Sequence, residues 1–414
     1  MSLSTAPGGD ERLRSKPKKR LAIIVSHPIQ HFVSLYRALA DSPDIVVRVF
    51  YASRIGLDPY FDAEMNVELA WKMDLLAGYD HVFLAGAERV KSIGFSTIDS
   101  PGLEDALDAY DPDSVMVYGY NQRNALRAAD WGHRMGRAVL MISDSELLQR
   151  RAFWRRAVKR LLVPLAYRRI DAFLSVGDRN EAYYRHHGVP ASRIFRSPFT
   201  IDEGAFKRAA AVRAEVRAAL RKDLGLEPDA IIALFVGKLT ERKRPQDLLR
   251  AVSALADDGV TVHAVFAGNG ALMEPMRQEI EALGAPGHLL GFVNVDRLPG
   301  LYAASDLLVH PSEADPHPLV CSEAACVGLP VVLSDRIGAE GATDIARSGE
   351  NALVYPVGDV QALAAHIRSL AEDADLRAAM GRRALEIFGE LDLHRSVDGI
   401  RRAIEAGPRR GRRA

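Results

Sequence analysis

Short runs of apolar, often β-branched residues recur along the chain, and each is followed by a stretch whose apolar positions repeat at helical spacing. These runs occupy residues 21–26, 45–50, 114–118, 138–143 and 172–176 in the first half, and 231–236, 261–266, 288–292, 307–310, 330–333 and 352–355 in the second. Runs that are apolar throughout are typical of parallel strands covered by helices on both faces. The pattern therefore predicts an α/β, doubly wound architecture.

The strand signal stops between about residues 197 and 229, where an Ala/Arg/Glu-rich helical stretch, 209–224, ends in Gly225. The alternation then restarts, which predicts two Rossmann-like domains facing an interdomain cleft. The expected segments are a disordered basic arm at 1–20, a first domain at 21–205, a linker helix region at 206–228, a second domain at 229–389, and a helix with an Arg-rich tail at 390–414 that packs back on the first domain.

Composition excludes several classes of protein. The 414 residues are 48% hydrophobic and 26% charged, which is ordinary globular usage. Because 54 Lys and Arg balance 54 Asp and Glu, no global field attracts nucleic acid. Two cysteines without zinc-ligand spacing favour a reducing cytoplasm. No apolar segment follows the basic N-terminus as in a secretory signal, and no run reaches the roughly 18 to 20 apolar residues of a membrane span, so any membrane contact is expected to be peripheral.

The loop after the run 307–310 carries two carboxylates. Asp315 lies before a short predicted helix that opens near Leu319 and closes at Gly328, and Glu323 lies in its first turns. Unpaired N–H groups at a helix start form an anion site, and the two carboxylates could reach hydroxyls on either side of a phosphate. The alternative is that Asp315 caps the helix and Glu323 is a solvated helix residue.

A second loop, after the run 231–236, is rich in cations. Gly237 lets the backbone approach a ligand, and Pro245 marks the start of the next helix. Four cations lie between them: Lys238, Arg242, Lys243 and Arg244. Because cations at a helix N-terminus are unfavourable to its dipole, we interpret them as ligands of a bound anion. The alternative is a solvated basic turn.

The loop after the first run contains His27, Gln30 and His31, with Pro28 fixing the turn. These side chains could hydrogen-bond a sugar or phosphate, and unpaired surface histidines are an equal alternative. The turn 268–270, Gly-Asn-Gly, does not match the dinucleotide-binding fingerprint and is interpreted as a plain strand-to-helix turn.

Four stretches of the second half together resemble the retaining glycosyltransferases of family four, also called glycosyl transferases group 1, which have GT-B architecture. They are Phe-Val-Gly-Lys-Leu at 235–239 with Lys-Arg-Pro at 243–245, Leu-Gly-Phe-Val at 290–293 with Leu-Tyr-Ala-Ala-Ser-Asp at 301–306, the acidic segment 315–323, and the segment 349–359. The first half resembles the family more loosely, through its first loop and residues 183–202. The resemblance implies an N-terminal acceptor domain and a C-terminal nucleotide-sugar donor domain.

The resemblance also implies roles for single residues. The family's Glu-x7-Glu element falls on Asp315 and Glu323, so that Glu323 would accept from the ribose hydroxyls and Asp315 would face the donor sugar. The family's basic pair falls on Lys238 and Lys243, which would neutralise the diphosphate, and together with Asp315 they form the expected catalytic set. The other expected donor-binding residues are Gly237, Phe292, Val293, His317, Pro318, Leu319 and Val320. On the acceptor or sugar side we expect His27, Gln30, His31 and Asp144.

This chain departs from the family pattern at three positions. Asp315 is one methylene shorter than the usual Glu, lysine replaces the arginine whose fork binds phosphate at two points, and Pro318 replaces a glycine that would offer an N–H. These departures concern the geometry of the donor more than the class of reaction.

The implied activity is transfer of a sugar from a nucleotide-diphosphate sugar to a glycan, lipid-linked or small-molecule acceptor, with retention of the anomeric configuration, in cell-envelope or glycan biosynthesis. Attack would occur on the front face, with the leaving phosphate taking the acceptor proton and the two lysines stabilising its charge. No cofactor and no metal are expected, because these loops hold no DxD-type pair. The alternatives are a GT-B epimerase or phosphorylase and a non-catalytic protein that binds sugar nucleotides.

Residues 150–169 form a basic amphipathic stretch with eight Arg or Lys and no Asp or Glu. Its apolar residues recur at helical spacing: Phe153, Trp154, Ala157, Val158, Leu161, Leu162 and Leu165. Such a helix could lie on an anionic membrane at the inner face and present a lipid-linked acceptor. The interpretation that we favour is a helix that packs this stripe on the sheet beside residues 172–176.

Overall fold

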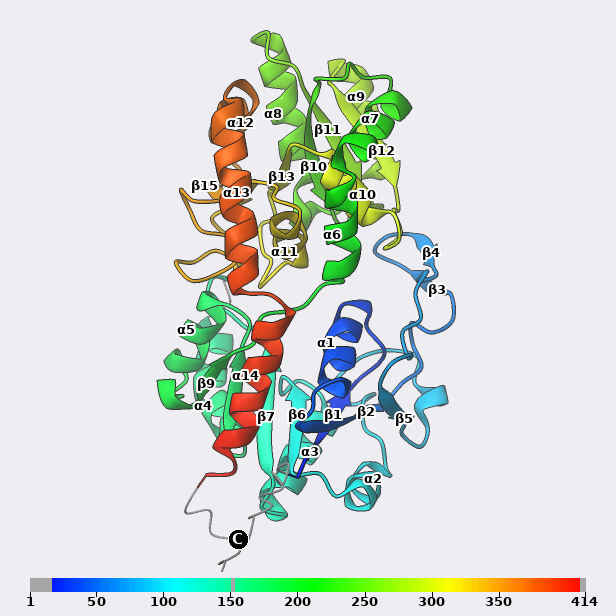
Figure 1. Cartoon of the computed structure of the whole chain (residues 1–414), viewed down its shortest axis with the longest axis vertical. Helices are drawn as coiled ribbons and strands as arrows, with labels where there is room; N and C mark the ends of the chain where they lie inside the picture. The colour runs from blue at the N-terminus through cyan, green and yellow to red at the C-terminus, as the bar shows by residue number, and fades with distance from the viewer. Residues whose placement is uncertain (1–16, 150–152, 410–414) are drawn as a thin grey trace, which may run out of the picture.

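The computed structural model describes residues 17–149 and 153–409, which form two lobes that lie one above the other in Figure 1. The lower lobe contains a seven-stranded parallel sheet of order β5-β2-β1-β6-β7-β8-β9, and the upper lobe a six-stranded parallel sheet of order β12-β11-β10-β13-β14-β15. A separate antiparallel pair, β3-β4, rises from the lower lobe to the side of the upper one. This is the GT-B architecture that was expected.

The strands have the following bounds. In the lower sheet they are β1 (Lys19–Val25), β2 (Ile45–Tyr51), β5 (Asp80–Phe83), β6 (Ser114–Tyr118), β7 (Ala138–Ser143), β8 (Ala172–Ser175) and β9 (Ile194–Arg196). In the upper sheet they are β10 (Ile231–Val236), β11 (Val262–Ala267), β12 (Gly287–Gly291), β13 (Leu307–His310), β14 (Val331–Ser334) and β15 (Ala352–Tyr355). The separate pair consists of β3 (Tyr60–Asp62) and β4 (Val67–Leu69).

Helices cover both faces of each sheet. Those of the lower lobe are α1 (Gln30–Ala40), α2 (Leu103–Tyr110), α3 (Arg123–Arg134), α4 (Phe153–Tyr167) and α5 (Asp178–His186). Those of the upper lobe are α6 (Glu203–Ala211), α7 (Arg213–Leu224), α8 (Pro245–Asp257), α9 (Met273–Leu283), α10 (Leu298–Ala304), α11 (Leu319–Cys326), α12 (Val360–Glu372) and α13 (Ala374–Glu390). The last helix, α14 (Leu393–Ala406), returns to the lower lobe.

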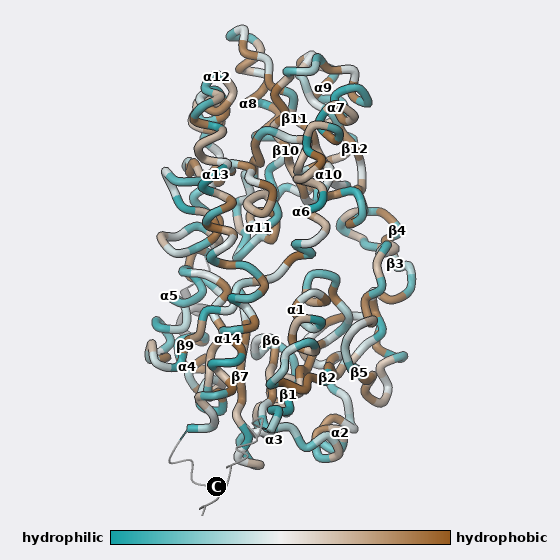
Figure 2. Tube along the Cα trace, in the orientation of Figure 1, coloured by the Kyte–Doolittle hydropathy of each residue, from teal (hydrophilic) through white to brown (hydrophobic). Residues whose placement is uncertain are grey.

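The central strands are buried on both sides, as their uninterrupted apolar character requires. In β1, Leu21 and Ile23 pack into the core on the α1 face, whereas Ala22 and Ile24 pack into the core that contains α2 and α3. Figure 2 shows the corresponding hydrophobic stretches along the strands inside each lobe. Both faces of a parallel sheet therefore contribute a hydrophobic core.

The predicted strands are confirmed with shifts of at most two residues at an end, but three features were not predicted. β5 and β9 are edge strands with partly exposed residues, and the β3-β4 pair is only three residues long on each side. The helical stretch 209–224 is not one helix, because the chain bends at Val212 between α6 and α7. Gly225 ends α7 in the left-handed conformation, with φ 67°.

Helix α14 ties the end of the chain to the lower lobe, where it packs against α1 and against β7 to β9. The Ser396 hydroxyl donates to the carbonyl of Pro198 at 2.6 Å, and Arg401 Nε lies 2.7 Å from Asp44 Oδ2. The chain thus leaves the lower lobe after β9, builds the upper lobe and returns. The exact domain boundaries given above stay predictions.

The face of helix α4 that is exposed differs from the one expected under the interpretation that we favoured for residues 150–169. Val163 and Tyr167 are buried against the lobe, whereas Val158, Leu161 and Leu162 are 46%, 71% and 58% exposed, and Leu165 is 47% exposed. The prediction that the apolar stripe packs on the sheet is therefore wrong for these four residues, because a different face of the helix meets the lobe. The side chains of 153–157 lie outside the described residues.

The predicted basic arm lies largely outside the described residues, which begin at position 17, and so does most of the Arg-rich tail, since positions 410–414 are not described. Across the two described ranges, no helix combines the length and the apolar character needed to cross a bilayer.

Candidate functional site

The glycines after β10 and β11 bring the ends of these strands together. The N–H of Gly237 donates to the carbonyl of Ala267 at 3.0 Å, and a Cβ atom on Gly268 would lie 1.8 Å from the Gly237 carbonyl oxygen. Both glycines have large positive φ angles, 152° and 159°. Besides turning the chain, Gly268 therefore allows its own backbone to approach that of Gly237, the residue before Lys238.

Lys238 directly follows Gly237 and reaches across to the lower lobe. Its Nζ lies 2.9 Å from Oδ2 of Asp62 and 2.7 Å from Oε2 of Glu64, both in the β3-β4 hairpin. Partial burial lowers the pKa of Lys238, but the hydrogen bonds to the two carboxylates outweigh it and hold this pKa above its ordinary value. Lys238, the residue predicted to bind the donor diphosphate, is therefore already paired with two carboxylates.

Lys243 and His310 both contact Oδ2 of Asp315. Lys243 forms an ion pair with this oxygen, and His310 Nε2 lies 3.0 Å from it. Burial alone would raise the pKa of Asp315, but the bond from His310 and the charge of Lys243 hold it well below its usual range. Asp315 is thus a largely buried, ionised carboxylate and not a helix cap, since Pro318 precedes α11 without any side-chain cap.

Glu323 lies in the second turn of α11, partly buried. The Tyr302 hydroxyl from α10 donates to its Oε2 at 2.5 Å. Burial raises the pKa of Glu323 to about 7, and the bond from Tyr302 offsets this only in part. The interpretation of Glu323 as a solvated helix residue is therefore wrong.

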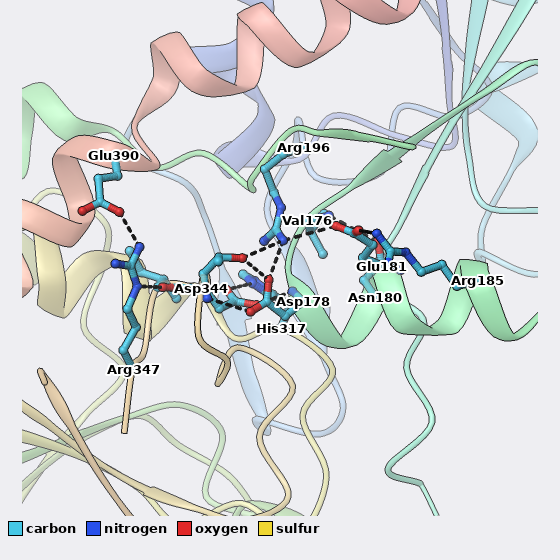
Figure 3. A network of polar contacts seen from close by, with 12 residues as sticks. Val176, Asp178, Asn180, Glu181, Arg185, Arg196, His317, Asp344, Arg347 and Glu390 are labelled. Atoms are coloured by element: carbon cyan, nitrogen blue, oxygen red, sulfur yellow. Dashed lines mark hydrogen bonds and ion pairs between the residues drawn. The ribbon is translucent and has the colours of Figure 1, made fainter. Parts of the chain in front are cut away.

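His317 is buried where the two lobes meet, as Figure 3 shows. Its Nε2 lies 3.0 Å from Oδ1 of Asp344, whose Oδ2 accepts the backbone N–H of Asp178 at 2.7 Å. Asp178 in turn accepts hydrogen bonds from the Thr343 backbone and hydroxyl. The start of α5 in the lower lobe is thus joined to the loop 341–344 of the upper lobe, with His317 in the same network.

The first-strand loop and Glu323 line one cavity of about 360 Å³ between the lobes. Gln30 and His31 contribute from the lower lobe, and further walls come from Ile201, Asp202, Ala205, Phe206, Arg208, Val295, Asp296, Leu298 and Pro299. Burial lowers the pKa of His31 to about 4, with a further contribution from nearby His27. His27, whose pKa burial also lowers to about 4, lies beside Ser26. Both histidines are therefore neutral at pH 7.

The remaining predicted residues lie outside the lining of this cavity. Asp144 follows β7, and burial raises its pKa. Phe292 follows β12 and makes an edge contact with Trp71 of the lower lobe, at 6.4 Å between ring centroids. Pro318 is buried, and Leu319 and Val320 are partly buried against the core of the upper lobe.

Several residues of the site were not predicted from the sequence, among them Asp62, Glu64, Asp178, Tyr302, His310, Thr343 and Asp344. Tyr302 lies in the segment 301–306, so its position was marked but its contact with Glu323 was not. The four acidic residues carry no local signal, because each acts through a partner that lies far away in the sequence. Within 17–149 and 153–409, no three His, Cys, Asp or Glu side chains are grouped so that they could hold a metal ion.

Comparison with known proteins supports the resemblance. Residues 216–386 match the family model described as glycosyl transferases group 1. The chain is 33% identical over 233 residues to the D-inositol 3-phosphate glycosyltransferase of Geodermatophilus obscurus, covering 53% of this chain and 49% of that protein. It is 28% identical over 177 residues to the sulfoquinovosyl transferase SQD2 of Arabidopsis thaliana, covering 42% and 33%. The chain spans about half the length, or less, of the curated relatives it matches.

The fold is also that of solved glycosyltransferase structures. The Anabaena protein HepE, solved in complex with UDP, superposes with a TM-score of 0.70 at 18% identity, covering 94% of this chain and 100% of that one. Another HepE structure contains UDP-glucose. The lipopolysaccharide-biosynthesis glycosyltransferase WaaG superposes with a TM-score of 0.60 at 16% identity, covering 92% and 98%. At these identities the likeness concerns the fold alone.

Proposed function

Since residues 216–386 belong to the glycosyl transferases group 1, we propose that this protein is a retaining glycosyltransferase that moves a sugar from a nucleotide-diphosphate sugar to a hydroxyl of an acceptor. The observation that carries the proposal is the interdomain cavity, which is lined by Gln30 and His31 of the lower lobe and by Glu323 of the upper lobe. In open α/β sheets, ligands bind at the carboxyl ends of the strands, and both sheets contribute such loops here.

In the proposed reaction, the bond between the sugar C1 and the diphosphate oxygen breaks, and the acceptor oxygen forms its bond to C1 on the same face. The acceptor proton passes to the departing diphosphate. Negative charge builds up on the leaving oxygens, so cations at this point stabilise the transition state more than the bound donor. Lys238 and Lys243 supply these cations, and no residue has to act as a covalent nucleophile. The reaction is proposed to need neither a metal nor a cofactor.

The remaining residues hold the donor. Glu323 accepts from the ribose hydroxyls, backbone near Phe292 and Val293 meets the base, and Asp315 faces the sugar. His317 donates from Nε2 to Asp344, which leaves Nδ1 as an acceptor for a sugar hydroxyl. This nitrogen is buried and has no partner among the described residues.

The test separates an enzyme from a binding protein. Lys238→Ala and Lys243→Ala should each lower turnover at saturating donor by about a hundredfold or more, which corresponds to roughly 3 to 4 kcal/mol of barrier. Lys→Arg at either position should keep part of the activity, because arginine retains the charge and suits phosphate. Steady-state transfer, with the product anomer identified by NMR, measures both. Parental turnover in both alanine variants would refute the leaving-group role, and an inverted anomer would refute the retaining mechanism.

We also propose that α4 places the protein on the cytoplasmic face of an anionic membrane, where the acceptor is lipid-linked. Val158, Leu161, Leu162 and Leu165 follow the i, i+3, i+4, i+7 spacing of one helix face, and this face is exposed. Cations flank it, including the exposed Arg160 and Arg168, while residues 150–169 contain no carboxylate. An exposed apolar face with a cationic border fits the interface of an anionic bilayer.

A further inference from the structure

The β3-β4 hairpin places two carboxylates on the cation that the proposed mechanism assigns to the donor diphosphate. Asp62 lies at the end of β3 and Glu64 in the turn that follows, and both contact Nζ of Lys238 in the other lobe. A lysine ammonium has three donors, and three carboxylate oxygens lie within 2.7 to 3.2 Å of it. Two carboxylates therefore occupy the ammonium group while the hairpin stays in place, and a phosphate must compete with them for it.

The hairpin is shaped to present these carboxylates. Asp62 Oδ1 also accepts the backbone N–H groups of Glu64 and Met65, at 3.0 and 2.9 Å, so it fixes the turn as well as meeting Lys238. Asn66, with φ 51°, closes this turn in the left-handed conformation. Glu64 is 66% exposed and has Lys238 as its one recorded side-chain partner among the described residues. Its position is thus set by charge and not by packing.

The same segment also reaches the loop after β12. The side-chain amide of Asn294 donates to the carbonyl of Ala70 at 2.7 Å, and Lys72 Nζ lies 3.5 Å from Asp296 Oδ2. Trp71 meets Phe292 edge to face. The stretch from Asp62 to Lys72 therefore crosses the cleft at both the predicted phosphate end and the predicted base end of the donor site.

We propose that Asp62 and Glu64 are an internal counter-ion of Lys238 that competes with the donor diphosphate, so that these two carboxylates set the affinity of the protein for its donor. The proposal rests on the proposed function, since it takes Lys238 as a diphosphate ligand. A ligand that binds only when Lys238 is released has its affinity reduced by the fraction of molecules in which the lysine is free. Because the pair is partly exposed, salt weakens it as well.

The test measures the binding of inorganic pyrophosphate and of UDP by isothermal titration, which requires neither the right sugar nor an acceptor. In Asp62→Asn/Glu64→Gln both anions should bind about fivefold more tightly, the size expected from a partly exposed ion pair. Asp62→Asn keeps a side-chain oxygen for the turn, so the hairpin should fold. Glu64→Gln alone should give part of the gain. Glu68→Gln, which removes the same charge from an exposed position of the same hairpin, should leave the affinity unchanged.

The same hairpin substitutions in a Lys238→Gln protein separate competition for Lys238 from general repulsion between the hairpin carboxylates and the anion. In Lys238→Gln the hairpin substitutions should give no gain, because the shared cation is absent. A gain of the same size in this background would overturn the proposal, and so would parental affinity in Asp62→Asn/Glu64→Gln. If Lys238→Gln itself binds pyrophosphate and UDP as the parent does, the assignment of Lys238 to the donor phosphate fails, and the proposal fails with it.

Discussion

The hydroxyl of Tyr302 and the carboxylate of Glu323 share a hydrogen bond of 2.5 Å, on neighbouring helices of the upper lobe. Tyr302 is buried and gives Glu323 its one recorded side-chain partner among the described residues. The carboxylate is therefore held in place at the cavity by a neutral hydroxyl, and within 17–149 and 153–409 it forms no ion pair. This explains why burial determines its pKa, which is raised to about 7.

The first prediction concerns stability and pH. The unfolded chain titrates Glu323 near its ordinary pKa of about 4.5, so between pH 4.5 and 7 the folded state binds more protons. The stabilisation from this group is therefore present below pH 4.5 and lost as the pH rises through 7. The advantage of Glu323→Gln over the parent in the free energy of unfolding should grow by on the order of 2 to 3 kcal/mol between pH 5 and pH 8.

Urea unfolding of parent and variant at both pH values measures this difference. Glu405→Gln removes a carboxylate from the exposed surface of α14 and serves as the control, for which the difference should stay constant. A difference for Glu323→Gln that is independent of pH would show that the carboxylate is not buried as described.

The second prediction concerns donor binding. If Glu323 accepts from ribose hydroxyls, it must be ionised, so donor binding should weaken as the pH falls through 7. At one pH unit below the pKa only about a tenth of the groups are ionised, which corresponds to a loss of up to about tenfold in affinity. Titration with the nucleotide sugar that gives the largest thermal shift, at pH 6 and pH 8, measures this effect. Glu323→Gln should bind weakly at both values, whereas equal pH dependence in parent and variant would remove Glu323 from the ribose site.

The third prediction concerns the contact between the lobes. Gly177 precedes α5 in an extended conformation that any residue can adopt, but a Cβ atom there would lie 2.2 Å from Asp344 Oδ2 and 2.7 Å from His317 Nε2. Gly177→Ala should therefore separate the lobes, which small-angle X-ray scattering would record as a larger radius of gyration, and faster amide hydrogen exchange at 341–346 should accompany it.

Gly389→Ala is the matched control, because nothing lies within 4 Å of a Cβ atom at that position of α13. It should leave the scattering curve unchanged and raise stability by about 0.5 to 1 kcal/mol, since alanine is the better helix former. An unchanged radius of gyration in Gly177→Ala would mean that the loop 341–344 moves aside while the lobes stay together.

The central strands could be predicted from the sequence because they are apolar on both faces. The runs 231–236 and 307–310 coincide with β10 and β13. The edge strand β5 was missed, because its residues alternate between partly buried and exposed and give no continuous apolar signal. For α4 the apolar period was recognised, but the period alone does not say which face meets the sheet.

The candidate site was predicted only as far as it follows from strand ends. Loops after β10 and β13 had to lie at one edge of the upper sheet, which placed Lys238 and Asp315 in the cleft. The contact between Lys238 and Asp62 joins residues that are 176 positions apart in different lobes. It depends on how the lobes meet, and no local pattern around Asp62 marks it.

The last prediction concerns the exposed face of α4. Leu161 and Leu165 are 71% and 47% exposed, and each would bury its side chain in the bilayer interface if the helix binds there. Burial of a leucine is worth roughly 1.5 to 3 kcal/mol, so Leu161→Ser/Leu165→Ser should bind vesicles of phosphatidylglycerol and phosphatidylcholine at least about tenfold more weakly than the parent.

Leu283→Ser/Leu385→Ser is the matched control, since both leucines are 49% exposed and lie in the upper lobe. The parent should bind vesicles of phosphatidylcholine alone weakly, and added salt should weaken its binding to the anionic vesicles because the attraction of cations is screened. Vesicle flotation measures all of these. Equal binding of the parent and the α4 variant would exclude this helix as the membrane contact, and no binding by the parent would exclude the membrane itself as the partner of this face.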